Sequence, residues 1–254
     1  MLVMGPAASA FATAKVRFVN ARAGSPPVRL RVTAGSAPAP QGGATSFGQI
    51  TPYASVPSGT AQLSIGAGSG SAASATTTQQ LTDGARYTAV ALAKGTKGFE
   101  LKVYEDGKAK AGTARLRVLH AAPELGSPNV RLGQRTIAEA VAFRTASPYL
   151  SVDPGAYTLS VVRPGGTKAI FQKRVSLSAG VATTAILAGS AGARERLIVA
   201  TDDTVTPAGA PETGLGGLAG GGGPQWLLIA LAALTAGAMG GLAQVALARR
   251  NGRR

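Results

Sequence analysis

The chain has 254 residues, no cysteine, and a net charge of +15 from 26 Lys and Arg against 11 Asp and Glu. Without cysteine it has no disulfide, thiolate metal site or cysteine nucleophile. The acids are too few and too scattered to indicate a carboxylate pair or a calcium loop, and the many Gly, Ala, Ser, Thr and Val residues favour short strands and turns.

Residues 1–14 are typical of the end of a signal peptide. The start is apolar, and residues 8–10 and 12–14 are both small-x-small cleavage patterns. The positively charged start is missing and the apolar part is short. We expect a signal-peptide remnant that precedes an exported protein; the alternative is a disordered apolar N-terminus.

Residues 15–203 contain two copies of one sequence repeat, with a period near 96–102 residues. Similar segments follow in the same order in both copies: 16–21 and 116–121, 28–30 and 130–132, 52–56 and 148–152, 59–64 and 155–160, 81–84 and 177–180, and 101–104 and 197–200. We therefore predict two domains, 15–106 and 114–203, joined by a linker at 107–113.

Each unit contains short alternating runs separated by turn residues, the pattern of an antiparallel β-sandwich. Val28, Leu30 and Val32 would face one way, and Arg29 and Arg31 the other. Other predicted elements are loops at 33–46 and 66–78, core strands at 87–92 and 182–187, and a hairpin with strands at 156–162 and 169–172 around a turn at 163–168.

Short motifs recur in both copies. An apolar-Arg-apolar-apolar-(Asn/His)-Ala run opens each copy, a Pro-Tyr pair lies at the centre, and Pro-x-Gly or a close variant precedes a strand. Residues 120–123, His-Ala-Ala-Pro, are close to the His-Ala-Ser-Pro of the bacterial domain-of-unknown-function family 4397, whereas residues 20–23 of the first copy depart from it. The unit resembles this family over both copies. The resemblance implies a secreted or surface-anchored β-sandwich, commonly in tandem, and implies no activity.

Residues 204–224 are rich in Gly and Pro, a composition typical of a flexible tether. Within them, Ala-Pro-Glu-Thr-Gly resembles the cell-wall sorting signal of Gram-positive bacteria, Leu-Pro-x-Thr-Gly. Pro211, Thr213 and Gly214 match, but Ala210 stands where that family has Leu, and the spacer that follows is long. The resemblance implies sortase as a partner, which would cleave after Thr213 and join it to the wall.

Residues 225–248 predict a transmembrane helix. No charged side chain occurs from Trp226 to Ala248, and at about 1.5 Å per residue this run spans roughly 35 Å, enough to cross a bilayer. The arginine-rich tail at 249–254 would stay in the cytoplasm. We expect a single-pass protein of the cell membrane with its ectodomain outside, or one that sortase attaches covalently to the wall.

The only histidine, His120, corresponds to Asn20 in the first copy. This favours a polar residue that satisfies local backbone groups over a base, and no Gly-x-Ser-x-Gly elbow occurs. The acids at 105–106 and 202–203 close the two copies, which favours a structural role over metal binding. We predict no catalytic residue, no metal site and no cofactor.

The repeated arginines are the best candidates for contact with a partner. Arg17 corresponds to Arg117 and Arg29 to Arg131, and because each alternates with apolar residues, we expect all four on outward strand faces. There they would contact anionic cell-wall polymers such as teichoic acid, or act as solvated residues that discourage sheet aggregation. Nucleic acid is not an expected partner, because the domains are exported and lack interleaved exposed aromatics.

These observations favour an all-β ectodomain of two tandem antiparallel β-sandwiches, immunoglobulin-like or transthyretin-like, plus one C-terminal transmembrane helix. The expected function is that of a non-enzymatic cell-surface protein that displays two basic domains at the bacterial envelope in a binding or structural role. The alternatives are an envelope hydrolase or carbohydrate-active enzyme, which would need two suitably placed acids, and a mechanical spacer without a ligand.

Overall fold

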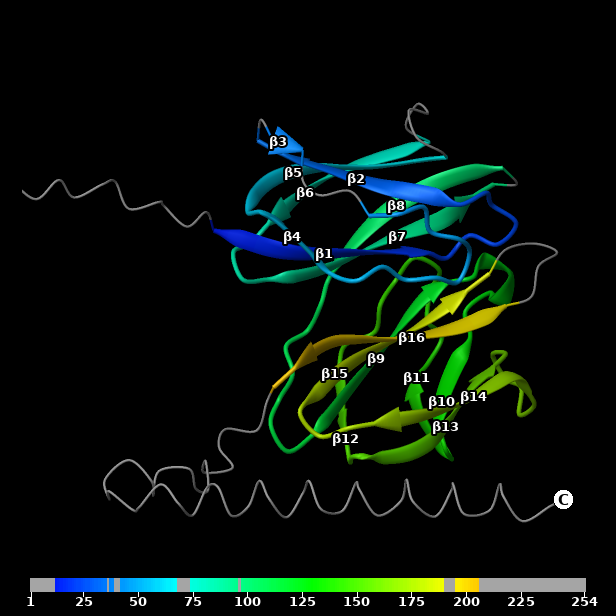
Figure 1. Ribbon diagram of the computed structural model, residues 1–254. Coiled ribbons are helices and arrows are strands. Elements are labelled where there is room, and N and C mark those ends of the chain that lie inside the picture. Colours follow the sequence, from blue (N-terminus) through cyan, green and yellow to red (C-terminus); the bar gives the residue numbers. More distant parts are fainter. Residues whose placement is uncertain are drawn as a thin grey trace, which may run out of the picture. The chain divides into compact units, whose positions relative to one another are not determined.

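Strands make up nearly all of the regular structure. The computed structural model describes residues 12–35, 37–38, 42–67, 74–95, 97–189 and 195–205. Within these residues the strands form four four-stranded sheets, two in each repeat, and the one helix is a short 3-10 turn, Pro123–Leu125. The predicted all-β class and the two similar domains are confirmed (Figure 1).

The predicted terminal segments fall outside this region. Almost all of the signal-peptide remnant, most of the tether, the motif with Pro211, Thr213 and Gly214, and the predicted transmembrane helix at 225–248 all lie beyond the described residues. In the part of the chain that is described, no helix is long and apolar enough to cross a membrane.

The first repeat forms two layers (Figure 1). One sheet has the strand order β4-β1-β7-β8, and the other has the order β3-β2-β5-β6. The strands are β1 (Thr13–Asn20), β2 (Val28–Ala34), β3 (Ala37–Pro38), β4 (Ala54–Pro57), β5 (Gly59–Ala67), β6 (Ala75–Leu81), β7 (Arg86–Lys94) and β8 (Gly98–Glu105).

The second repeat has the same topology, strand for strand. Its sheets have the orders β12-β9-β15-β16 and β11-β10-β13-β14. The strands are β9 (Ala114–Ala121), β10 (Asn129–Leu132), β11 (Arg135–Ala138), β12 (Leu150–Val152), β13 (Gly155–Val162), β14 (Ala169–Leu177), β15 (Val181–Ala188) and β16 (Arg196–Thr204). The internal repeat seen in the sequence is thus a repeat of structure.

One strand pair in each domain is parallel, so the prediction of purely antiparallel sheets was wrong for that pair. Strand β1 runs parallel to β7 from Lys15↔Arg86 to Asn20↔Ala91, and β9 runs parallel to β15. All other ladders between named strands in the described region are antiparallel. Local alternation of side chains predicts a strand but carries no information on the direction of a partner so distant in sequence.

The two sheets of each repeat share a core built from alternating side chains. On β2, Val28, Leu30 and Val32 are buried, and Arg29 and Arg31 are half-buried on the other face, as predicted. The two sheets of the second repeat likewise share one cluster. The predicted hairpin is also confirmed, because β13 and β14 pair antiparallel from Gly155↔Leu177 onward.

Strands β1, β7, β9 and β15 are buried on both faces. On β7 every residue between Arg86 and Lys94 is buried, and Val90 and Leu92 are fully buried although they point away from the core of their own repeat. They belong to a third core that joins the outer faces of β1 and β7 to those of β9, β15 and β16. Its members are Val19, Ala21, Val90, Leu92, Leu119, Ala121, Ile186, Ala188 and Ile198.

This third core makes the two repeats one packed unit, in agreement with their position in one compact part of the chain. Continuous apolar runs, in place of alternation, are typical of strands that are covered on both sides. The runs at 87–92 and 182–187 therefore have a second reason to be apolar beyond the core of their own repeat.

Candidate functional site: a reciprocal polar network between the repeats

Arg17 and Arg117 are buried between the repeats, so the prediction that they lie on exposed faces was wrong. Their exposed fractions are 4 % and 5 %. The face of β1 and β9 on which they lie is outward with respect to its own domain, as alternation indicated. This face is buried because the other repeat packs against it. The alternation of side chains within one repeat does not predict this packing.

Arg17 donates through all three guanidinium nitrogens, and two of them reach the second repeat. Its Nε donates to Thr88 Oγ1 on neighbouring β7 at 2.9 Å. One terminal nitrogen donates to the carboxylate of Asp202 on β16, and the other to the carbonyl oxygen of Thr201. A planar guanidinium suits this arrangement, because its donors diverge in a fixed fork.

Arg117 makes the same contacts in the opposite direction. Its Nε donates to Thr184 Oγ1 at 2.8 Å, and its terminal nitrogens donate to the Asp106 carboxylate and to the carbonyl oxygen of Glu105 at 2.7 Å. Each partner is the repeat equivalent of a partner of Arg17. The two repeats therefore use equivalent residues to contact each other. Such a reciprocal contact is called isologous and is the pattern of a two-fold symmetric dimer.

Two equivalent tyrosines complete the network. The Tyr53 hydroxyl donates to Asp106 and the Tyr149 hydroxyl donates to Asp202, each at 2.7 Å. The Arg17 guanidinium lies 4.6 Å from the Tyr53 ring centroid, and that of Arg117 lies 4.7 Å from the Tyr149 centroid. Burial raises the pKa of both phenols, so each stays a protonated donor.

Each central carboxylate accepts from an arginine, a tyrosine and a threonine. Asp202 accepts from Arg17, Tyr149 and Thr184, and both carboxylates have fully buried side chains. Burial raises the pKa of Asp202, and the positive charge of Arg17 opposes that rise. Buried ion pairs of this kind define geometry more than they add stability, because desolvation offsets their attraction. The network therefore fixes how the repeats dock.

Two more ion pairs cross the interface nearer solvent, where the repeats differ in sequence. Arg86 contacts Asp203 at 3.1 Å, and Arg144 contacts Glu100 at 2.8 Å. The Tyr104 hydroxyl also donates to the backbone carbonyl of Arg144 at 2.9 Å. We call these two pairs the rim pairs.

His120 satisfies backbone groups at the end of β9, as predicted. Its Nδ1 accepts from the Ala122 amide at 3.2 Å, so its Nε2 carries the proton and donates to the Gly126 carbonyl at 2.8 Å. Asn20 has the equivalent role in the first repeat, where its side-chain oxygen accepts a hydrogen bond from the Arg22 amide. Burial lowers the pKa of His120, and the bond to Gly126 opposes that change.

Arg29 and Arg131 keep their predicted places on outer sheet faces, on β2 and β10. Both are half-buried, Arg29 opposite Gly66 and Arg131 opposite Ser160. Within the described residues the Nε of each is buried without a hydrogen-bond partner, and a terminal nitrogen of Arg131 donates to the Gln134 carbonyl at 3.3 Å. The structure therefore separates the four predicted contact residues into a buried pair and an outer pair.

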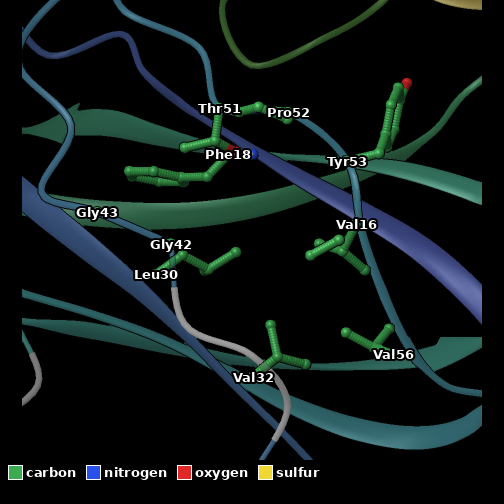
Figure 2. Close-up of a pocket in the computed structure, with 11 residues that line it drawn as sticks. Val16, Phe18, Leu30, Val32, Gly42, Gly43, Thr51, Pro52, Tyr53 and Val56 are labelled. Atoms are coloured by element: carbon green, nitrogen blue, oxygen red, sulfur yellow. Dashed lines mark hydrogen bonds between the residues drawn. The ribbon is translucent and has the colours of Figure 1, made fainter.

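A small apolar cavity of about 240 Å³ lies in the first repeat at the β4 edge. Figure 2 shows Val16, Leu30, Val32 and Val56 around it, with the hydroxyl end of Tyr53 turned away. That hydroxyl is engaged with Asp106. The second repeat also has a hollow at the corresponding edge, beside Tyr149 and Leu150. The lining of the cavity in the first repeat is mostly apolar, so it indicates no polar ligand.

The buried network was missed at the sequence level although its parts were noticed separately. The equivalent arginines, the central Pro-Tyr pairs and the acids that close each copy were recognised as repeated. The pairing of the arginine of each copy with the aspartate of the other copy was not predicted. The sequence feature that indicates such an interface is that β7 and β15 are apolar on both faces. In the described residues no group of three or more possible metal ligands occurs.

Comparison with known proteins agrees with this architecture. No curated protein matches the chain. The model of the domain of unknown function DUF4397 matches twice, at residues 14–131 and 114–212, which is consistent with two tandem copies. The two matches together cover most of the chain, and the chain belongs to the DUF4397 family.

Proposed function

We propose that this chain is a non-enzymatic protein of the bacterial cell surface that displays its two domains as a single unit, in a binding or structural role. The observation that carries the proposal is the use of the repeated charged residues. Arg17, Arg117, Asp106 and Asp202 are engaged with one another inside the interface and leave no free acid or base there.

We also propose that each domain is a transthyretin-like β-sandwich. An immunoglobulin constant-type domain has its first two strands in the same sheet. Here β1 and β2, like β9 and β10, belong to different sheets. Of the two types that the sequence left open, the strand order supports the transthyretin-like one.

The proposed ligands are anionic cell-wall polymers. Residues 15–203 contain 22 Lys and Arg against ten Asp and Glu. Among the described residues, four basic and four acidic side chains form ion pairs across the interface. Eighteen basic and six acidic side chains therefore remain for the rest of the two domains. A surface of this sign attracts phosphate-rich polymers. Arg29 and Arg131, which lie on the outer sheet faces, are the proposed contacts.

A pull-down with purified cell wall tests this role. We expect retention at low salt that falls as salt rises, because screening weakens contacts between exposed charges. The double variant Arg29→Gln/Arg131→Gln should lose retention, whereas Arg163→Gln/Lys168→Gln, which removes two exposed charges from the β13–β14 turn, should retain it. No retention of the unchanged protein at low salt would leave the mechanical spacer as the better function.

We propose that the C-terminal segment anchors the protein, either by a retained transmembrane helix at 225–248 or through sortase at Thr213. Cell fractionation separates these possibilities. If sortase acts, Thr213→Ala moves the protein from the wall fraction to the membrane fraction. An unchanged distribution, with a C-terminal mass that includes Arg254, supports the retained helix.

A further inference from the structure

We propose that the face shared by the two repeats is a pairing surface for a domain of the same kind, with a self-complementary centre and a rim that selects unlike partners. The first and second repeats would then recognise each other without the linker between them. This inference concerns the interface alone and does not depend on the ligand proposed above.

The centre of the surface is self-complementary because its contacts are reciprocal. Arg17 contacts residues 201–202, and Arg117 contacts the equivalent residues 105–106. The apolar cluster beside them is also contributed by equivalent positions, such as Val90 and Ile186. Two first repeats, or two second repeats, would therefore make the same central contacts.

The rim breaks this symmetry. One rim pair is Glu100–Arg144, and the repeat equivalents of these residues are Arg196 and Gly48. Arg196 and Gly48 are also neighbours, because a Cβ added to Gly48 would lie 2.6 Å from an Arg196 nitrogen. In the pair Arg86–Asp203, the equivalents are uncharged, Ala182 and Gly107. The charged rim pairs therefore form only once each and only between unlike repeats.

Like pairing would lose these contacts. Two second repeats would bring Arg196 against Arg144, two positive charges, and would set Asp203 opposite Ala182. Two first repeats would set Glu100 opposite Gly48, without an ion pair. Juxtaposed like charges suppress wrong partners, and such rim charges act mainly on specificity.

Backbone strain at Arg144 agrees with selection for the unlike pair. Arg144 has φ +66°, and its equivalent Gly48 has φ +78°. Glycine adopts this left-handed region freely, whereas an arginine there is strained. The second repeat has arginine at this position, and its side chain contacts Glu100 of the first repeat while its carbonyl accepts from Lys102 and Tyr104.

Cleavage of the folded chain tests the pairing. A specific protease site inserted between Ala111 and Gly112, which are exposed, allows the ectodomain to be cut after folding. Native mass spectrometry and size-exclusion chromatography at micromolar concentration should then show the two fragments as a 1:1 complex. Fragments that separate as folded monomers, or that form like pairs as often as unlike ones, would overturn the proposal.

Charge exchange at the rim tests the selection. Glu100→Arg in the cleavable protein should raise the dissociation constant of the fragments roughly tenfold, because it places an arginine against Arg144. Adding Arg144→Glu should restore most of the affinity. The matched control Asp153→Arg changes an exposed acid in the turn between β12 and β13 and should have no effect. An equal effect of Glu100→Arg and Asp153→Arg, or no recovery in the double variant, contradicts the role of the rim.

Discussion

At the scale of single residues, Asp106 and Asp202 should have the same energetic importance because their surroundings are equivalent. Replacing either with Ala removes the acceptor of one buried arginine, one tyrosine and one threonine. Breaking a buried ion pair in this way costs about 3–5 kcal/mol in the free energy of unfolding. Denaturant unfolding measures the cost.

The exposed Asp153→Ala, within about 0.5 kcal/mol of the unchanged protein, is the control. The double variant Asp106→Ala/Asp202→Ala should cost less than the sum of the single variants, since both belong to one network. Costs below about 1 kcal/mol, or strict additivity, would contradict the network as described.

His120 should make stability depend on pH in a way that its replacement removes. Its folded pKa lies below its ordinary value near 6.5 because the ring is buried. As pH falls below about 6.5, the unfolded chain binds a proton that the folded chain does not, so stability falls until the folded pKa is passed.

Since the chain has no other histidine, His120→Asn, which copies Asn20 of the first repeat, should flatten the stability profile between about pH 6.5 and pH 5. Urea unfolding at a series of pH values provides the test. An unchanged slope in the variant would assign the dependence to other groups.

At the scale of strands and turns, two glycines of the segment before β4 should respond oppositely to alanine. A Cβ on Gly42 would meet only Thr51 Cγ2, at an ordinary 3.7 Å. Gly42→Ala should therefore stabilise by about 0.4–1 kcal/mol through the unfolded state. Gly48 has φ +78° and lies against Arg196, so Gly48→Ala should destabilise by about 1 kcal/mol or more. Thermal unfolding of both variants checks the pair, and effects of equal sign contradict it.

The strands were predictable from sequence where one face met water. On β2 the alternation of apolar and basic residues gave both the strand and its buried face. The β13–β14 hairpin was predictable because its turn is local. The parallel β1–β7 pairing and the burial of Arg17 were not, because both depend on elements far away in the chain. The same local pattern, a basic residue between apolar neighbours, leaves Arg29 half-buried on an outer sheet face and buries Arg17 between the repeats.

At the scale of the whole molecule, the interface between the repeats contains a large share of the acidic side chains. The described ion pairs between the repeats involve Asp106, Asp202, Asp203 and Glu100, which are four of the ten acids in residues 15–203. These ion pairs use equal numbers of acidic and basic side chains, so the net charge of +12 of residues 15–203 lies on the rest of the two domains.

The same interface should make the two repeats unfold together. A shared apolar core and a buried polar network couple the domains, so calorimetry of the ectodomain should show one transition with equal calorimetric and van't Hoff enthalpies. Val90→Lys places an unpaired charge in the shared core and leaves the core of the first repeat itself intact. We expect it to split the transition in two, while Thr78→Lys, on the exposed face of β6, leaves one transition. If Val90→Lys only lowers the midpoint of a single transition, the second repeat depends on the first for its fold, and the pairing of two independent domains is wrong.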